Sequence, residues 1–295
     1  MKHVLGVVGG SGMYGIAGLE EVERLTIETP YGPPSDELIR SRLAGTDHEV
    51  LFLPRHGVGH RIPPHAINYR ANLCALKLAG ATHVLSISAT GSMREAIEPG
   101  DLVVVDQFID LTKRRISTFF GPGATAHVAF SEPICPVMAE AVLRSAKQVV
   151  GDLPAAERPT VHQGGTYVCI EGPQFSTRAE SLLYRSWQVD LIGMTNMPEA
   201  KLAREAELPY ATLALATDYD CWHESEEAVD VAAVIARLGT MVDEAKAIIK
   251  HLAATLPDPA KSPATGALAG AIMTAPDRML PEAKDRLAWL LADKS

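Results

Sequence analysis

The chain has 295 residues, of which 47% are hydrophobic, and this is enough apolar material for one large buried core. Its formal net charge of −9 and calculated pI near 5.6 argue against a nucleic-acid-binding or anionic-membrane surface, because both need clustered Lys and Arg. We therefore expect small-molecule partners, with no nucleic acid and no membrane.

The cysteines and the apolar runs predict a soluble cytoplasmic protein. The four cysteines are far apart and form no C-x-x-C pair, which disfavours a zinc ribbon or a disulfide framework. No stretch reaches the roughly 18 apolar residues of a membrane helix. The apolar run near the N-terminus is too short for the core of a signal peptide.

Short apolar runs alternate with helical patterns along the chain. The runs predict strands that are buried on both faces, at residues 4–8, 49–53, 83–89, 101–105, 166–170, 190–194 and 211–217. The helical patterns lie at residues 65–80, 132–150, 177–187, 197–206, 230–254 and 281–292. The third of these opens with a Thr177-x-x-Glu180 capping box. This alternation predicts an α/β fold, a single domain with a mostly parallel or mixed central sheet flanked by helices.

We expect residues 1–255 to form that domain. Residues 256–278 are rich in Pro, Ala and Gly and precede the last helical pattern. Residues 256–295 are therefore predicted to be a C-terminal linker and helix that pack on or near the site.

The carboxyl ends of the strands are the places to look for a site, because ligands of open α/β sheets bind there. The first strand leads into a G-x-G-x-x-G pattern from Gly10 to Gly15. A dinucleotide loop would need a helix at this point, but Gly18 and several prolines interrupt the sequence that follows. A plain tight turn and a phosphate loop built from glycine amides and the Ser11 hydroxyl are the other interpretations.

Arg55 and His56 follow the second apolar run directly. The planar guanidinium of an arginine matches phosphate oxygens, and histidine adds a further polar contact. A metal site built from His56, His60 and His65 is disfavoured, because glycines interrupt the spacing and no Cys or carboxylate completes the set. An ordinary surface loop is the remaining alternative.

The third apolar run ends in Ser88, Ala89 and Thr90, followed by Gly91. Hydroxyls and free amides at such a turn can bind an anion, although Ser and Thr at strand ends are often only turn formers. Three ends with this character at one sheet edge predict a site for free phosphate.

The last apolar run, in ATLALATDYDCW at residues 211–222, ends in Asp218 and Asp220. A carboxyl group in a semi-apolar pocket can hold a proton near neutral pH and pass it to a leaving group. Alternatively, both carboxylates are solvated caps of the next helix, since Asp is a common N-cap residue.

Together these stretches resemble the trimeric purine nucleoside phosphorylase family, and within it the enzymes that act on 5′-methylthioadenosine. The resemblance covers roughly residues 4 to 250 and is carried by GVVGGSG, ETPYGPPSD, LPRHG, NYRANLCALK, GDLVVVDQFID, EGPQFSTRAES, GMTNMPEAKLARE and ATDYDCW. It departs from the family at Ser11 and Ser88, where threonine is frequent, and this substitution keeps the hydroxyl. Residues 256–295 do not match closely.

The resemblance implies a role for each matching residue. Phosphate is bound by Ser11, Arg55, His56, Ser88, Ala89 and Thr195. Phe175 packs on the purine, Met194 lies against the ribose, and Asp218 and Asp220 face the base, with Asp218 as the proton donor. The 5′ substituent is lined by Val231, Val234 and Ile235, for which core packing is the alternative. The family forms homotrimers, and the resemblance implies that His127 of one subunit reaches the neighbour's site.

The implied reaction is phosphorolysis of S-methyl-5′-thioadenosine to adenine and 5-methylthioribose 1-phosphate, a glycosyltransferase (pentosyltransferase) step in methionine and purine salvage. It needs no metal and no organic cofactor, because inorganic phosphate is the co-substrate. Acceptance of adenosine stays open. The rival interpretations are a nucleosidase that uses water, which would not need the phosphate-binding residues, and a nucleoside sensor without catalysis.

Overall fold

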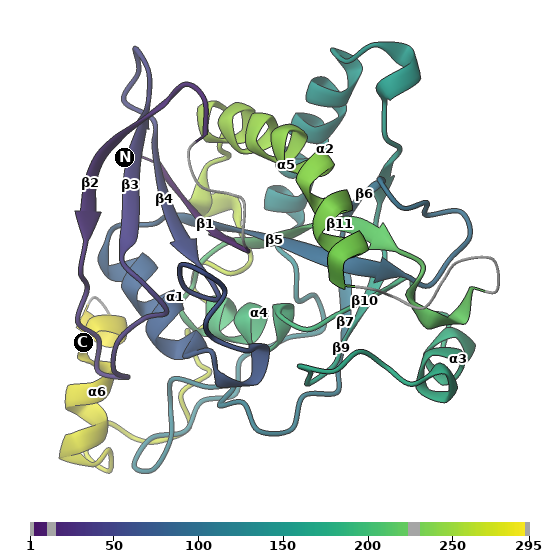
Figure 1. The fold of residues 1–295 in the computed structure, drawn as a ribbon. Coiled ribbons are helices and arrows are strands. Elements are labelled where there is room, and N and C mark those ends of the chain that lie inside the picture. The colour runs from purple at the N-terminus through teal and green to yellow at the C-terminus, as the bar shows by residue number, and fades with distance from the viewer. Residues whose placement is uncertain (1–2, 11–15, 224–230, 293–295) are drawn as a thin grey trace.

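The computed structural model describes residues 3–10, 16–223 and 231–292. In this part of the chain, eleven strands form one mixed sheet, with helices on both of its sides (Figure 1). The expected α/β fold is confirmed. All four cysteines are free thiols, and none of the helices described is long and apolar enough to cross a bilayer.

The centre of the sheet consists of four parallel strands in the order β4-β1-β5-β11. They are β1 (Val4–Gly9), β4 (Glu49–Pro54), β5 (His83–Ser92) and β11 (Tyr210–Asp218). β1 and β4 are buried along their whole length, as expected for strands that are covered on both faces.

The other strands extend this centre at its edges. Antiparallel strands β3 (Leu38–Leu43) and β2 (Leu19–Leu25) follow β4, while β6 (Leu102–Val104) and then β8 (Val161–Gln163) follow β11. Three short parallel strands form the remaining part, namely β7 (Gln107–Asp110), β9 (Thr166–Cys169) and β10 (Leu191–Gly193). All seven predicted strands are present, and β2, β3, β7 and β8 are additional.

β5 joins the two parts of the sheet. Its first residues pair with β1, most of its length pairs with β11, and its last two residues pair with β10 through Leu191–Ser92 and Ile192–Gly91. The carboxyl end of β5 is therefore surrounded by the ends of several strands, and this is where the candidate site lies.

Among the described residues, six α-helices flank the sheet, and all six correspond to predicted helical patterns. They are α1 (Tyr69–Leu78), α2 (Pro136–Gly151), α3 (Arg178–Ser186), α4 (Asn196–Glu205), α5 (Val231–Ala254) and α6 (Pro281–Leu291). α2 and α5 lie on one side of β5, and α1 and α4 lie on the other (Figure 1). The expected capping box opens α3, with Thr177 Oγ1 accepting from the Glu180 main-chain N–H. Short 3₁₀ turns lie at Pro64–Ala66, Ala155–Glu157, Asp220–Trp222 and Pro259–Lys261.

The C-terminal segment packs against the main domain. The His127 main-chain N–H donates to Ala271 O at 2.9 Å, and the Met273 N–H donates to Thr125 O at the same distance. The Trp289 ring of α6 lies 5.0 Å from Phe119 and 6.3 Å from Tyr31. A role for this segment near the substrate site stays a prediction.

His83, the first residue of β5, predicts how folding depends on pH. Burial lowers the pKa of this imidazole from its usual 6.5 to about 4. Between these values the unfolded chain takes up a proton that the folded chain does not, so stability falls as the pH falls from 6.5 to 4. The free energy of unfolding should therefore decrease less on acidification in His83→Gln than in the parent, by up to about 3 kcal/mol.

The measurement is urea unfolding at pH 7 and pH 4.5. His65→Gln is the matched control, because His65 is exposed. If the free energy of unfolding falls by the same amount between pH 7 and pH 4.5 in both variants, His83 does not cause the pH dependence of stability.

Candidate active site

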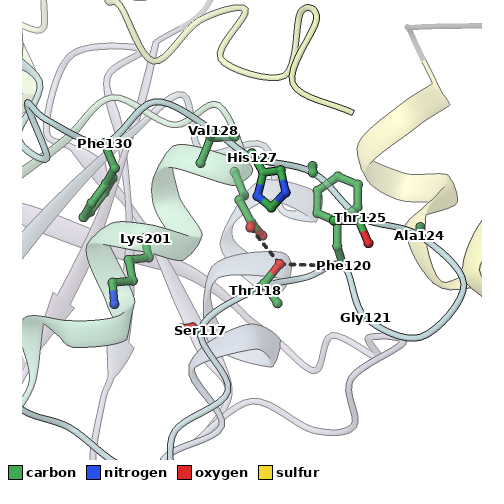
Figure 2. A pocket seen from close by; sticks show the side chains of 12 residues that line it. Ser117, Thr118, Phe120, Gly121, Ala124, Thr125, His127, Val128, Phe130 and Lys201 are labelled. Carbon is green, nitrogen blue, oxygen red and sulfur yellow. Dashed lines mark hydrogen bonds between the residues drawn. The ribbon is translucent and has the colours of Figure 1, made fainter. Parts of the chain in front are cut away.

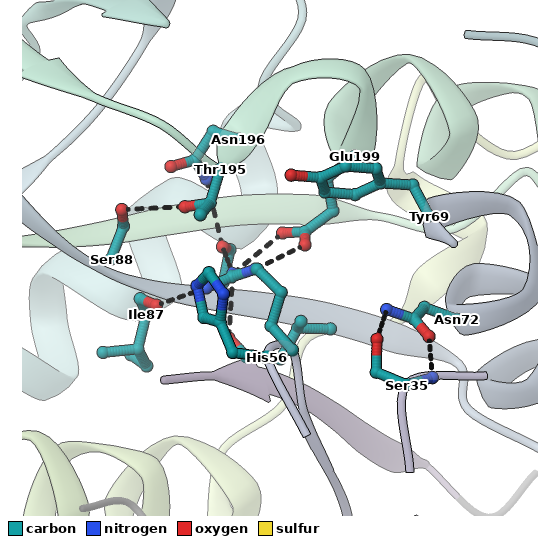
Figure 3. A network of polar contacts seen from close by, with 12 residues as sticks. Ser35, His56, Tyr69, Asn72, Ile87, Ser88, Thr195, Asn196 and Glu199 are labelled. Atoms are coloured by element: carbon teal, nitrogen blue, oxygen red, sulfur yellow. Dashed lines mark hydrogen bonds and ion pairs between the residues drawn. The ribbon is translucent and has the colours of Figure 1, made fainter. Parts of the chain in front are cut away.

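Arg55 follows β4 and is held in the interior by a network of polar contacts, which include those with Ile87 and Glu199, both labelled in Figure 3. Its side chain is 2% exposed, and its guanidinium donates to both carboxylate oxygens of Glu199, at 2.9 and 3.1 Å. The remaining contacts are with Ile87 O at 3.1 Å, Val8 O at 3.2 Å and Ser86 Oγ at 2.5 Å. These bonds fix the arginine beside the middle of β5.

The network determines how much of Arg55 is left for a ligand. Burial is the largest single influence on its pKa and lowers it, but the charge and the hydrogen bonds of Glu199, with smaller contributions from Tyr210 and Tyr69, together outweigh burial, so that the pKa is raised and the group stays charged. Of its five N–H groups, one at Nη1 has no acceptor among the described residues. The arginine can therefore offer an anion at most one direct hydrogen bond without breaking the network.

His56 is buried next to Arg55. Its Nδ1 lies 2.8 Å from Ile62 O, and because a carbonyl can only accept, Nδ1 carries the hydrogen. The ring stacks on His60 with 4.1 Å between the ring centroids. Burial lowers the pKa of His56 to about 4, so at neutral pH the ring is uncharged and Nε2 is a hydrogen-bond acceptor.

Ser88 and Thr195 come together from different strands. Ser88 lies on β5, Thr195 precedes α4, and their hydroxyl oxygens are 3.2 Å apart (Figure 3). Both residues are buried, and the hydroxyl of Tyr167 lies 3.3 Å from Ser88 Oγ. Ala89 is exposed, and Ser11 lies outside the described residues. The structure thus brings Arg55, Ser88 and Thr195 together beside the middle of β5.

Asp218 ends β11 and lies beside Gly91 of β5. Its Oδ1 accepts from the Asp220 main-chain N–H at 2.8 Å, and its Oδ2 accepts from Thr217 Oγ1 at 2.7 Å. A Cβ at position 91 would lie 3.0 Å from Asp218 Oδ1, so glycine permits the close approach. Since Ser88 pairs with Ala214, the Ser88 and Asp218 levels are about 10 Å apart along the strands.

Asp220 is buried, and its Oδ2 accepts from Ser181 Oγ of α3 at 2.5 Å. Burial raises the pKa of this carboxyl group, while the Ser181 bond lowers it. Neither acid is the residue before α5, because Asp218 ends β11 and Asp220 opens the 3₁₀ turn at Asp220–Trp222. The Asp218 carboxylate instead accepts from the Asp220 main-chain N–H at the start of this turn.

The expected substrate residues have different surroundings. Phe175 is 46% exposed, and Met194 is half-buried beside Gly172. On α5, Val234 is half-buried and Ile235 is 63% exposed, while the side chain of Val231 lies outside the described part. An exposed phenyl ring and an exposed aliphatic side chain offer apolar surface that a ligand or a second subunit can cover.

His127 lies apart from the other candidates. It lines a cavity of about 500 Å³ together with Phe120, Phe130, Lys201 and Glu205 (Figure 2). None of the other expected site residues lines this cavity. His127 therefore lines a cavity that the described candidate residues around β5 do not share.

The described residues contain no group of three or more His, Cys, Asp or Glu side chains that could hold a metal ion. This includes His56, His60 and His65, of which His56 is already bonded through Nδ1.

Comparison with known proteins identifies the family. A model of the phosphorylase superfamily matches residues 4–254. This chain belongs to that superfamily. The present chain is 50% identical over 292 residues to the S-methyl-5′-thioadenosine phosphorylase of Geobacter sulfurreducens, and the match covers 99% of both chains. It is also 50% identical to the protein of the same name from Cereibacter sphaeroides, covering 96% of this chain and 95% of that one.

Solved structures agree with this assignment. A methylthioadenosine phosphorylase from an antarctic soil metagenomic library superposes on this superfamily member with a TM-score of 0.90 and 48% identity, covering 98% and 99% of the two chains. The methylthioadenosine phosphorylase of Schistosoma mansoni in complex with adenine gives a TM-score of 0.81 and 37% identity, covering 88% of this chain and 94% of that one.

Two important residues of this superfamily member were not expected from its sequence. Glu199 has the appearance of an ordinary helical glutamate, yet it is fully buried against Arg55. Ser181 ends the stretch EGPQFSTRAES but was given no role from the sequence, and its hydroxyl donates to Asp220. Glu199 could have been sought on one ground only. A buried arginine requires a carboxylate partner, and the helix α4 contains one.

Proposed function

We propose that this chain catalyses phosphorolysis of S-methyl-5′-thioadenosine to adenine and 5-methylthioribose 1-phosphate. The observation that carries the proposal is the register of β11 on β5, which sets Asp218 about 10 Å along the strands from the Ser88 level. A nucleoside between these points has its base near the acid and its anomeric carbon near the hydroxyls. The names of relatives that are 50% identical support the same activity.

In this proposal the phosphate is bound by the hydroxyls of Ser88 and Thr195, the free Nη1 hydrogen of Arg55, Nε2 of His56 and the main chain at Ala89, with Ser11 completing the set. Nε2 of a neutral His56 accepts a hydrogen bond from the P–OH group of hydrogen phosphate. The Arg55 guanidinium stays charged at the edge of this pocket, and the Glu199 carboxylate cancels its charge, so the pair adds no net positive charge to the pocket.

Phosphate attacks the anomeric carbon of the ribose as the bond to the purine breaks. Positive charge develops on the sugar and is stabilised by the phosphate, while negative charge on the purine is relieved by a proton from Asp218 to N7. Asp220, held by Ser181, orients Asp218 through its main-chain N–H and faces the 6-amino group. No further cofactor is needed for this chemistry.

The remaining contacts of the substrate are apolar. Phe175 stacks on the purine, Met194 lies against the ribose, and Val231, Val234 and Ile235 surround the 5′-methylthio group. The exposure of Phe175 and Ile235 in the single chain supports these roles, because each offers uncovered apolar surface.

The enzyme forms a homotrimer in which His127 of one subunit reaches the site of its neighbour. The separation of His127 from the β5 site within one chain supports this arrangement. The reaction recovers adenine and a sugar phosphate, which assigns the enzyme to purine and methionine salvage. The free thiols of all four cysteines fit a cytoplasmic location.

The test is to incubate the purified protein with S-methyl-5′-thioadenosine, with and without phosphate. We expect adenine to be released only with phosphate, together with an equal amount of 5-methylthioribose 1-phosphate. Equal release without phosphate would identify a nucleosidase, and no release under either condition would indicate a sensor.

A further inference from the structure

Arg115 follows β7 and is buried among the ends of several elements. Its side chain is 1% exposed, and its Nε donates to Glu171 Oε1 at 3.2 Å. Nη1 donates to Tyr69 Oη at 2.9 Å, and to Met194 O and Met197 O at 2.6 Å each. Nη2 donates to Ile170 O at 3.2 Å and to Glu171 O at 2.7 Å.

These acceptors belong to four different segments. Tyr69 starts α1, the Ile170–Glu171 pair follows β9, Met194 follows β10, and Met197 lies in the first turn of α4. Four of the six acceptors are main-chain carbonyls. Such bonds fix where the backbone runs, because a main-chain carbonyl cannot turn away without moving its own segment.

The two strand ends that Arg115 joins also touch each other. A Cβ at position 172 would lie 2.5 Å from Met194 Sδ, and Gly172 has a φ of +65°, which favours glycine. A small displacement of either end would therefore alter the contact between them. The guanidinium donates to main-chain carbonyls at both ends.

We propose that Arg115 is a positioning residue that sets the main chain on two sides of the substrate. The inference rests on the proposed function. At Met194 it fixes the ribose contact and the adjacent Thr195, which binds phosphate. At Ile170 and Glu171 it fixes the start of the turn that leads to Phe175, which stacks on the purine. The arginine itself acts only through these residues.

Arg94 provides a matched comparison at the opposite end of β10. Its Nε lies 2.9 Å from Asp190 Oδ1, and its Nη2 donates to Gln188 O. Like Arg115 it combines a carboxylate with a main-chain carbonyl, but it does so before β10 begins. Replacing Arg94 therefore removes a comparable set of contacts from β10, but at the end of the strand that is away from Met194 and Thr195.

The experiment measures kcat and the KM of both substrates, with the Tm, for Arg115→Met, Arg115→Lys and Arg94→Met. We expect Arg115→Met to raise the KM for phosphate and for S-methyl-5′-thioadenosine at least tenfold each. Arg115→Lys should recover the Tm but not the KM values, because one ammonium group cannot reach all the segments. Arg94→Met should lower the Tm and leave both KM values within twofold of the parent.

A purely structural role would reduce the fraction of active enzyme, and hence kcat, while leaving KM unchanged. KM values within twofold of the parent in Arg115→Met, or in Arg115→Lys if the Met variant does not fold, would overturn the inference. Absence of phosphorolysis by the parent enzyme would instead overturn the proposed function, and this inference with it.

Discussion

Asp218→Asn should lower kcat/KM for S-methyl-5′-thioadenosine by about 10²–10⁴-fold, which is the usual contribution of a positioned acid. The loss is expected because the amide has no proton to transfer to N7 of the leaving adenine. Activity on inosine should fall much less, since the amide can donate to O6 of a 6-oxopurine. The ratio of the two kcat/KM values is therefore the quantity to measure.

The contacts of Asp218 make this substitution conservative. The amide oxygen of Asn can accept from the Asp220 N–H as Oδ1 does now, and the amide nitrogen can donate to Thr217 Oγ1. One N–H of the amide is then left for the base. Asp106→Asn is the matched control, because the Asp106 carboxylate also accepts from a main-chain N–H, that of Gly165, away from the site.

Asp220→Asn separates the roles of the two acids. Burial raises the pKa of Asp220, so this carboxyl group is also suited to hold a proton. A larger loss in Asp220→Asn than in Asp218→Asn would assign the transferred proton to Asp220. Equal losses for both nucleosides in Asp218→Asn would show that Asp218 does not read the base.

The parts of the fold that the sequence predicted are those with an unbroken apolar pattern. β1 and β4 are buried throughout, so every residue contributes to the signal. β2, with the sequence LEEVERL, is largely exposed at the sheet edge, and its charged residues conceal it. β8, with the sequence VHQ, contains no apolar run, whereas β6 and β10 are equally short but lie in apolar runs.

Residues of the candidate site could be proposed from the sequence where a polar residue ends an apolar run. Ser88 and Asp218 could be singled out in this way, and the register then sets them along one pair of strands. Glu199 and Arg115 could not be found, because their roles depend on partners far away in the sequence. Glu199 is 144 positions from Arg55, and Arg115 is 79 positions from Met194. No local spacing encodes such contacts.

The buried Arg55–Glu199 pair changes what an Arg55 substitution reports. From the sequence, removing Arg55 tests a phosphate contact alone. In the structure, its guanidinium is bonded to both oxygens of a carboxylate that is itself fully buried. Arg55→Met is therefore expected to destabilise the fold by about 3–5 kcal/mol, because it leaves an uncompensated charge in the interior.

Glu199→Met should cost a similar amount, since it leaves the Arg55 charge unpaired. The double variant should cost much less than the sum of the two, because methionines of comparable volume replace both charges at once. Urea unfolding of the parent, the two single variants and the double variant measures this coupling. The exposed Arg144–Glu140 pair, 3.1 Å apart on one face of α2, is the matched control, for which about 0.3–0.5 kcal/mol is expected.

The double variant then tests the role of Arg55 in phosphate binding without an unpaired charge in the interior. If it folds, its stability no longer depends on the ion pair, and a raised KM for phosphate reports the loss of the Arg55 side chain from the site. A double variant whose destabilisation differs by less than about 1 kcal/mol from the sum of the two single variants would show that the two buried charges do not stabilise each other. A parental phosphate KM in the folded double variant would remove Arg55 from the phosphate site and leave it as the support of Ile87 and Ser86 beneath that site.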